Sequence, residues 1–312
     1  LIGGVLQFLF QIPFLIKIRK LPKLVKGDHK AVKKLRNRML PALFGVSVSQ
    51  INLLIDTMIA SVLVSGSVSW LYYSDRLLEL PLALIGIALA TVALAKLSKH
   101  YANKDHQQFT RTIDYALKIG LILGLPACAG LILLAEPLMV SLFQYDAFTV
   151  FAAQQSSLSL MAYGSGLVAF IMVKILAPVF LARGDTKTPV KAGVVAMLSN
   201  VFLNGILGYY FDHVGLAVAT SISAVINGSL LYYYLRKQSI FTFSHDLTKI
   251  FFKVLAASFI MVIFILNFDQ AHSAYINADA FSRITTLLTT VCLSAFIYFL
   301  SLRVLGIRMR KL

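Results

Sequence analysis

Residues 71–97, LYYSDRLLELPLALIGIALATVALAKL, decide the fold class of this chain. Charged residues open the stretch at Asp75, Arg76 and Glu79, and no further charge follows until Lys96. A helix needs about 20 mostly apolar residues to cross a bilayer core, and the stretch exceeds that length. Its apolar residues are continuous and do not alternate with polar ones, which disfavours a barrel strand. The stretch therefore predicts a transmembrane helix.

Apolar segments of the same kind recur along the 312 residues, of which 58% are hydrophobic and 13% are charged. A soluble domain carries about 25% charged residues, so this composition excludes a soluble globular enzyme. We predict an all-α polytopic membrane protein with eight full transmembrane helices and one partial helix. The expected segments are 1–16 (partial), 39–63, 71–97, 113–135, 150–182, 189–211, 214–235, 250–268 and 284–305.

Lys and Arg residues gather in alternate connections between these segments, as expected of a helical membrane protein. Of the 29 Lys and Arg residues, 24 lie within 17–38, 96–111, 183–191, 236–249 and 303–311. None lies within 65–70, 136–148, 212–213 or 269–280. We therefore predict that the basic connections and the C-terminus are cytoplasmic. The net charge of +16 then reflects topology, and it predicts contact with anionic lipid headgroups and not with nucleic acid.

The chain opens with LIGGVLQFLFQIPFLI (1–16), which has no basic region before it and a dense basic run after it. That order does not fit a signal peptide, so we expect the end of a helix that begins in a missing part of a longer protein. The connection 17–38 has two open interpretations, an amphipathic helix on the cytoplasmic face or a solvated linker between two membrane lobes. Cys128 and Cys292 lie in apolar runs and predict neither a disulfide nor a metal site.

The charged residues at the start of 71–97 form the first candidate site, because charges at membrane depth are costly and usually functional. Asp75, Arg76 and Glu79 are spaced so that they share one face of a helix. Arg76 could hold a phosphate or carboxylate with two parallel hydrogen bonds, and the acids could hold Arg76 in place in an empty site. The alternative is a structural ion pair at the outer interface. Pro81 predicts a kink beside this site.

A second candidate site combines oxygen-bearing side chains in the middle of three other spans. Asp56 is the only acid in the middle of its span, and polar residues lie at comparable depth at Asn200, Asn204 and Thr220. Together they could bind a small hard monovalent cation or form a proton-sensitive carboxylate site. The alternative is hydrogen bonding between helices, which Asn and Thr commonly make in membranes.

Further charges lie toward the cytoplasmic side. Lys174 precedes Pro178 by about one turn, and its side chain either reaches the cytoplasmic surface or lines a cavity that attracts phosphate. The loop ARGDTKTP then places three charged residues at the predicted cytoplasmic mouth, Arg183, Asp185 and Lys187. The alternative for this loop is a simple turn before a helix.

Strings throughout the chain resemble one family. They are GGVLQFLFQIP, GVSVSQINLLIDTMIAS, SGSVSWLYYSDRLLELPLALIGIALATV, SLFQYDAFT, VKILAPVFLARGDTKTPVK and LLYYYLRKQ. They resemble the MurJ (MviN) family of bacterial lipid II flippases, which belongs to the multidrug/oligosaccharidyl-lipid/polysaccharide exporter superfamily. The string SGSVSWLYYSDRLLELP is too long for a chance match.

The resemblance implies a fold of fourteen transmembrane helices in two six-helix lobes plus a final pair. On that scheme the chain holds the end of the sixth helix (1–16), a basic connection (17–38), the six-helix second lobe (39–237) and the final pair (238–312). The final pair would form a groove for a lipid tail. The first lobe of the same protein would be missing, and with it several cavity arginines.

The resemblance also implies roles for the candidate residues. Arg76 matches a cavity arginine, and other positions that the family usually keeps charged are Asp75, Glu79 and Lys174. An ion site of the second lobe would be expected at Asp56, Asn200, Asn204 and Thr220, although an Asn at 204 supplies less negative charge than an acid.

The resulting hypothesis is a transporter and not an enzyme. It would move lipid II from the cytoplasmic to the periplasmic leaflet by alternating access, as a multi-pass protein of the bacterial inner membrane, for cell-wall synthesis. We expect no cofactor, coupling to Na⁺, H⁺ or the membrane potential, and lipid II and membrane lipids as partners. Two alternatives stay open, a cation-coupled multidrug exporter of the same superfamily and a membrane scaffold for envelope proteins.

Overall fold

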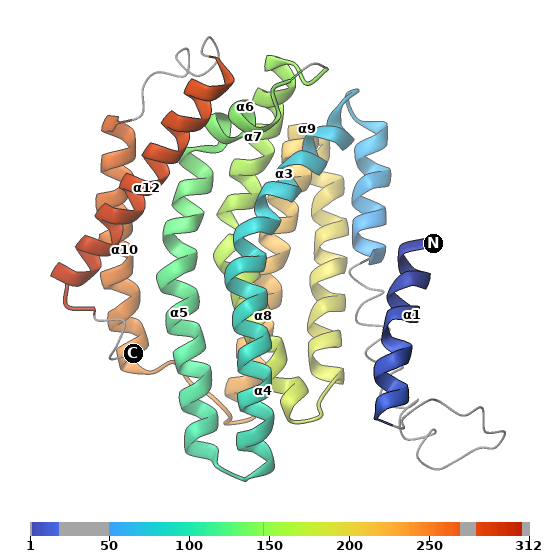
Figure 1. Cartoon of the computed structure of the whole chain (residues 1–312), viewed down its shortest axis with the longest axis vertical. Helices are drawn as coiled ribbons and strands as arrows, with labels where there is room; N and C mark the ends of the chain where they lie inside the picture. Colours follow the sequence, from blue (N-terminus) through green and yellow to red (C-terminus); the bar gives the residue numbers. More distant parts are fainter. Residues whose placement is uncertain (1, 19–49, 146, 269–278, 308–312) are drawn as a thin grey trace. The chain divides into compact units, whose positions relative to one another are not determined.

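A computed structural model describes residues 2–18, 50–145, 147–268 and 279–307, and these residues form helices without any strand. The chain divides into two units, Leu1–Leu40 and Pro41–Leu312. In the first unit, α1 (Ile2–Lys17) is a single helix (Figure 1). Its phenylalanine side chains are exposed. Most of the connection 17–38 lies outside the described residues, so both interpretations of it stay open.

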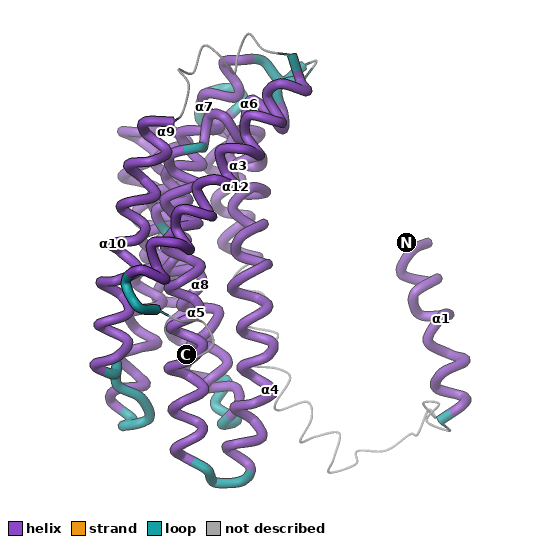
Figure 2. The backbone as a smooth tube through the Cα atoms, turned by 60° about the vertical axis from the view of Figure 1, so that its left-hand side comes forward, coloured by secondary structure: helices purple, strands orange, loops and turns teal. Residues whose placement is uncertain are grey.

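The second unit is a bundle of helices that run mostly along one direction (Figures 1 and 2). Five helical stretches in the described chain are long and apolar enough to cross a membrane. A sixth candidate span consists of two helices that meet at a bend. The helices are Gln50–Val62, α3 (Ser67–Pro81), η1 (Leu82–Ile87), α4 (Ala88–Ala102), α5 (His106–Leu133), α6 (Ala135–Phe143), α7 (Val150–Ser165), α8 (Leu167–Ala182), α9 (Lys187–Lys237), α10 (His245–Phe268) and α12 (Ala280–Val304).

Two features of the predicted spans differ in the structure. The span predicted at 150–182 is two helices, α7 and α8, which meet at an angle of 45° at Gly166. A Cβ at Gly166 would lie 2.9 Å from the Cα of Ser221, so a larger residue cannot occupy this close approach. The region 136–148, expected as a connection, contains the short helix α6.

The predicted turn at 212–213 is confirmed inside the long helix α9. Asp212 has φ 50° and ψ −136°, which breaks the helix into two arms that correspond to the spans 189–211 and 214–235. The arms approach so closely that a Cβ at Gly215 would overlap the carbonyl group of Leu207. Only glycine fits at this corner.

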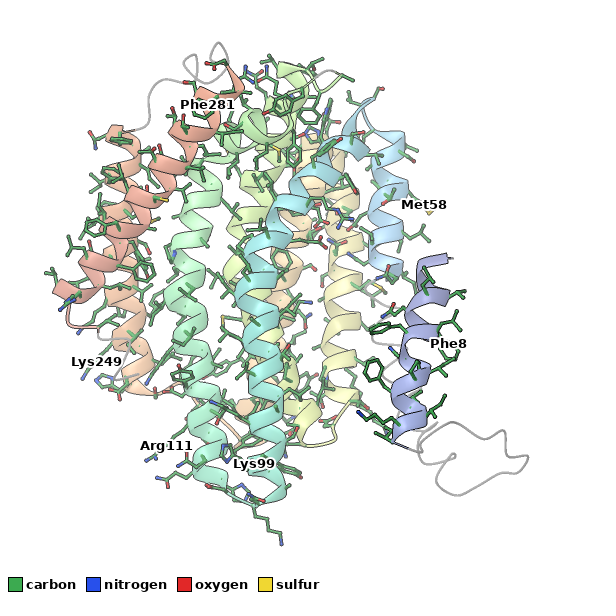
Figure 3. All side chains as sticks on the ribbon, viewed as in Figure 1. Phe8, Met58, Lys99, Arg111, Lys249 and Phe281 are labelled. Carbon is green, nitrogen blue, oxygen red and sulfur yellow. The ribbon has the colours of Figure 1, made fainter. Side chains whose placement is uncertain are left out.

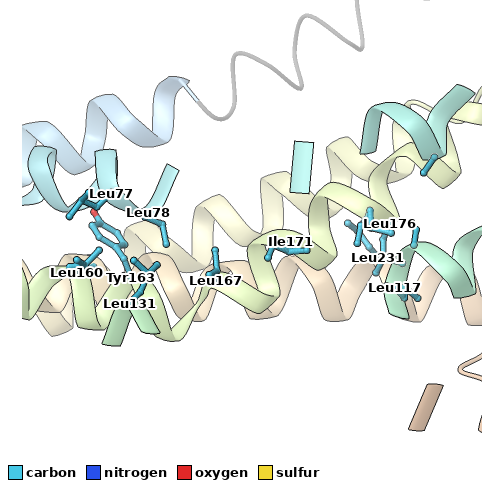
Figure 4. Close-up of a cluster of buried hydrophobic side chains, with 14 of the residues drawn as sticks. Leu77, Leu78, Leu117, Leu131, Leu160, Tyr163, Leu167, Ile171, Leu176 and Leu231 are labelled. Atoms are coloured by element: carbon cyan, nitrogen blue, oxygen red, sulfur yellow. The ribbon is translucent and has the colours of Figure 1, made fainter. Parts of the chain in front are cut away.

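Apolar side chains of α3, α5, α7, α8 and the second arm of α9 form the main core. Figure 4 shows Leu77, Leu160 and Tyr163 packed together at one end of this cluster. Ile171 and Leu176 continue the cluster toward the other end and are almost completely buried. The same cluster includes residues of α4, so α3 and α4 pack against one core.

The last two helices pack on α5 through a second, smaller core. It includes Val254 and Ile265 of α10 together with Tyr298 of α12. The Tyr298 hydroxyl donates a hydrogen bond of 2.5 Å to the carbonyl oxygen of Ile122. Pro126 has no N–H to occupy that carbonyl in the helix, so Tyr298 satisfies the acceptor that the proline leaves free.

Candidate functional site

The charged residues of α3 lie on the surface of the second unit. The guanidinium Nη1 of Arg76 lies 2.7 Å from Oε2 of Glu79, and both side chains are about half exposed, at 51% and 53%. The Arg76 Cζ lies 4.8 Å from the centre of the Tyr72 ring. Asp75 is half-buried beside them. An exposed ion pair adds little stability, so this arrangement orients the guanidinium more than it holds the fold together.

This geometry gives Arg76 the chemistry of an anion receptor. A guanidinium carries five N–H donors, and the structure assigns one of its nitrogens to Glu79. One face of the Arg76 guanidinium lies against the Tyr72 ring in a cation–π contact. The N–H donors at the edge of the guanidinium plane keep a fixed orientation. A phosphate or carboxylate can therefore exchange with Glu79 for the same donors.

The helix that carries Arg76 continues directly into a π-helical segment. Pro81 ends α3, and η1 follows at Leu82–Ile87 before α4 begins. The sequence predicted a kink at Pro81, and the structure has a π-helical segment directly after this proline, within one helical stretch that runs from Ser67 to Ala102. Such π segments are frequent at functional sites.

Lys174 of α8 packs against this π segment and lies apart from Arg76. A Cβ at Gly86 would lie 3.4 Å from Cγ of Lys174, so the absence of a side chain at Gly86 lets the lysine stem lie against η1. Ten residues separate Gly86 from Arg76, which corresponds to about 15 Å along a helix. Lys174 therefore contacts the helix that carries Arg76, but at a point about 15 Å away from Arg76, and Lys174 is exposed.

An apolar groove begins one residue after Glu79. It has a volume of about 370 Å³. Its walls include Leu80, Pro81 and Ile85 from α3 and η1, and residues of α5, α10 and α12. Pro126 and Tyr298 also line it, and because the Tyr298 hydroxyl is bound to Ile122, the tyrosine presents its ring and not a free donor. The charged group and the groove thus share one helix.

The polar residues predicted as a cation site come together in the structure. Asn204 Nδ2 donates to Oδ1 of Asp56 at 2.5 Å and to Oδ1 of Asn200 at 3.0 Å. Asn200 Nδ2 lies 3.2 Å from the hydroxyl oxygen of Thr220. Asn200 and Asn204 are almost completely buried. The helix Gln50–Val62 is thereby joined to both arms of α9.

Sequence reasoning missed one member of this polar cluster. Asn52 Nδ2 donates to Oδ2 of Asp56 at 3.1 Å, and its spacing of four residues from Asp56 was the signal available. Turning over the Asn200 amide would also bring its nitrogen within 3.0 Å of both Asn52 Oδ1 and Asp56 Oδ1. The cluster thus allows more than one hydrogen-bond arrangement.

The cluster contains the oxygen types that a small hard cation prefers, although Asn204 turns its Nδ2 and not its Oδ1 toward Asp56. Oδ1 of Asn204 is buried and makes no hydrogen bond within the described residues. That amide oxygen, the Asp56 carboxylate and the Thr220 hydroxyl are the oxygen ligands that such cations prefer. No group of three or more His, Cys, Asp or Glu side chains suited to a metal ion occurs in the described part of the chain, so the site would depend on amide and hydroxyl oxygens.

The loop at 183–187 is engaged in its own turn. Asp185 Oδ1 accepts hydrogen bonds from the backbone N–H groups of Lys187 at 3.1 Å and Thr188 at 3.0 Å. Arg183 donates to Oε1 of Gln238 at 2.8 Å, and Lys187 is exposed. Partial burial opposes ionisation of Asp185, but these bonds, the Thr188 hydroxyl and Arg183 together lower its pKa below the ordinary value. Asp185 therefore caps the first N–H groups of α9, which begins at Lys187.

The fold defines a class of protein, a multi-pass helical membrane fold that multidrug exporters also adopt. An outward-facing multidrug resistance MATE family transporter of the MOP superfamily superposes with a TM-score of 0.60 at 18% identity, covering 90% of this chain and 67% of that chain, which shows the shared fold. A family model described as "Lipid II flippase MurJ" matches residues 1–286. The chain belongs to the MurJ family, which confirms the resemblance and the all-α membrane fold.

Relatives within the family match the whole chain. The chain is 43% identical to the probable lipid II flippase MurJ of Vibrio cholerae over 100% of its own length and 59% of that protein. It is 44% identical to the Haemophilus influenzae protein of the same name, over 100% of its length and 62% of that protein. A structure titled "Lipid II flippase MurJ, inward closed conformation" superposes with a TM-score of 0.77 at 28% identity, over 96% of this chain and 59% of that chain. The chain thus spans about three-fifths of the length of these proteins.

Proposed function

We propose that this chain serves a transporter that moves lipid II from the cytoplasmic to the outer leaflet of the inner membrane. The observation that carries the proposal is an apolar groove whose lining begins at Leu80, the residue after Glu79, on the helix that carries the Arg76 and Glu79 ion pair. A ligand that fits both must have an anionic head and a long apolar tail. The names of the relatives supply lipid II as a molecule of that description.

The charged pair would act by exchange. With no ligand, Glu79 accepts from Arg76 and keeps the guanidinium in place above Tyr72. The diphosphate, or a peptide carboxylate, then replaces Glu79, and two parallel hydrogen bonds hold it more strongly than one lysine would. No bond is made or broken, so the protein lowers the barrier for moving a charged head and does not act as an enzyme.

The groove would hold part of the polyprenyl tail away from the charged residues of α3. Its walls are almost entirely apolar side chains, and they come from α5, α10 and α12 as well as α3 and η1. The charged head would therefore cross on one side of α3 and η1 while the tail stays in an apolar environment. Lys174 packs at Gly86, about 15 Å along the helix from Arg76, and would contact a more distant part of a large headgroup.

The polar cluster at Asp56 would couple transport to Na⁺, to H⁺ or to the membrane potential. Three outcomes fit its chemistry, Na⁺ binding, protonation of Asp56, or a response to the membrane potential without a bound ion. The cluster joins three helical segments, so a change in its charge would shift their packing. The charged loop at 183–187 would lie at the cytoplasmic mouth, where Arg183 and Lys187 add positive charge.

Complementation in cells tests the role of Arg76. In a strain depleted of its own flippase, we expect Arg76→Ala in the whole protein to abolish growth while membrane levels stay normal. The matched control is Arg303→Ala, which removes an exposed arginine at the end of α12, away from the groove. Normal growth of the Arg76→Ala strain would refute the role of Arg76. Drug sensitivity without a cell-wall defect would favour the multidrug exporter alternative.

A further inference from the structure

A second groove lies between α4 and α5, apart from the groove beside Arg76. It has a volume of about 290 Å³ and is lined from α4 by Leu89, Val92, Ala93 and Lys96. From α5 it is lined by Gln108, Arg111, Thr112, Tyr115 and Ala116. Figure 3 shows Arg111 and Lys99 at the same end of the second unit, which is the end predicted to be cytoplasmic.

The two basic residues of this groove lie at the same depth. Residues 103–105 connect α4 to α5 as a tight hairpin. Lys96 precedes the end of α4 by six residues, or about 9 Å, and Arg111 follows the start of α5 by five residues, or about 8 Å. Both lie within one groove, so their positive charges face the same space.

Neither charge is neutralised by an acid within the described residues. Asp114, three residues after Arg111, is already paired with Lys118 at 2.7 Å. Asp105, the acid of the connecting hairpin, accepts a hydrogen bond from the backbone N–H of Gln108 as the cap of α5. The groove therefore combines two unpaired cations with the side-chain donors of Gln108 and Tyr115.

An apolar wall continues from these charges toward the middle of the bundle. Leu89 lies seven residues before Lys96, or about 10 Å deeper along α4, and Val92 lies between them with 57% of its side chain exposed. Tyr115 is 44% exposed, as expected of an aromatic residue at a membrane interface. The groove thus has its cations near the predicted cytoplasmic end and its apolar wall deeper in the bundle. A membrane lipid has the same order, with a phosphate at the surface and acyl chains below it.

We propose that this groove binds an anionic glycerophospholipid of the cytoplasmic leaflet. Its phosphate contacts Lys96 and Arg111, Gln108 and Tyr115 donate to the remaining headgroup oxygens, and one acyl chain lies along Val92 and Leu89. Basic pockets between transmembrane helices on this side of a membrane are suited to such headgroups. The site is separate from the Arg76 site, so this proposal does not depend on the transported substrate.

Lipid binding by the whole purified protein tests the site. The measurement is the apparent affinity for phosphatidylglycerol, obtained from the lipid adducts retained in native mass spectrometry. The variant Lys96→Gln with Arg111→Gln removes both charges of the groove. The matched control, Lys99→Gln with Lys104→Gln, removes two charges from the same hairpin, and neither of these residues lines the groove.

We expect the groove variant to bind phosphatidylglycerol about 30-fold more weakly. Each basic residue near an anionic lipid surface raises the affinity about five- to sixfold, and the variant removes two such residues. The control variant should stay within about threefold of the unaltered protein. Equal weakening in both variants, or none in the groove variant, would overturn the proposal.

A competition experiment separates a lipid site from a site for soluble phosphate. Short-chain phosphatidylglycerol and glycerophosphoglycerol, the same headgroup without acyl chains, carry the same phosphodiester, but only the first has an acyl chain for the apolar wall. We expect the short-chain lipid to displace bound phosphatidylglycerol at a concentration at least tenfold lower than glycerophosphoglycerol does. Equal competition by the two compounds would overturn the assignment to a lipid.

Discussion

Replacing Tyr298 by Phe should destabilise the protein mainly through one carbonyl group of α5. Pro126 has no N–H, so the carbonyl oxygen of Ile122 has no partner one turn along the helix. The Tyr298 hydroxyl, on a side chain that is 1% exposed, donates to that oxygen at 2.5 Å. Tyr298→Phe removes the donor while the ring stays in place, so the carbonyl is left buried and unpaired.

The size of the effect follows from the burial of this carbonyl. An unpaired buried acceptor costs about 1–3 kcal/mol, and hydrogen bonds between membrane helices contribute at most about 1.7 kcal/mol. We therefore expect Tyr298→Phe to lower the free energy of unfolding by about 1–2 kcal/mol. With Pro126→Ala the new N–H at position 126 can reach the carbonyl of Ile122, so the same tyrosine substitution should then cost less than about 0.5 kcal/mol.

A double-mutant cycle measures this coupling directly. Denaturant unfolding of the four proteins in detergent gives a coupling energy between Tyr298→Phe and Pro126→Ala, which we expect to be about 1 kcal/mol. If Tyr298→Phe costs the same stability with and without the Pro126→Ala substitution, the reasoning is refuted. Both side chains line the apolar groove, so the cycle also tests what holds α12 against α5.

Three further outcomes follow from the polar cluster and the helix ends. Asp56→Asn should abolish any thermal stabilisation specific to Na⁺ or Li⁺. In the unaltered protein this stabilisation would reach about 2.7 kcal/mol at a cation concentration about 100 times the Kd. An equal shift in both proteins would exclude the ion site. The pKa of Asp185 is lower in the folded protein than its value of about 3.9 in the unfolded chain. Its contribution to stability is therefore present above a pH of about 3.9 and is lost as the pH falls through the folded pKa. In pH-dependent melting, Asp185→Ala should thus lose the most stability near neutral pH and little in acid. Gly215→Ala should abolish folded protein in membranes, because its Cβ would overlap the carbonyl group of Leu207, whereas Gly193→Ala, with open space around the glycine, should accumulate normally on an immunoblot.

The membrane spans could be predicted from the sequence because hydropathy and the positions of Lys and Arg are properties of single segments. The Gly164 and Gly166 pair indicates an interruption of the span 150–182, but the sequence does not show that Ser221 of another helix lies against Gly166. The π segment after Pro81 also escaped prediction, since a proline permits either a kink or a wider turn. Helix α6 was missed because it is too short to span a membrane and lies in a region read as a connection.

The candidate sites divide in the same way. Asp56 and Asn204 were identified by their depth in separate spans, although 148 residues separate them in the chain. The charged group of α3 followed from spacing alone. The groove beside it could not be derived from spacing, because it depends on which faces of α5, α10 and α12 meet α3. Likewise, the role of Tyr298 at Pro126 becomes visible only when the two helices are seen together.

Transport of lipid II into the outer leaflet of reconstituted vesicles tests the central claim most directly. The whole protein is reconstituted with lipid II that carries a fluorescent headgroup, and a membrane-impermeant quencher reports the lipid that has crossed. We predict that Arg76→Lys transports at least about tenfold more slowly than the unaltered protein, because lysine keeps the charge but loses the paired hydrogen bonds, while Arg303→Lys transports normally. Equal transport rates for Arg76→Lys and Arg303→Lys would contradict the assignment of the Arg76 site to the lipid head.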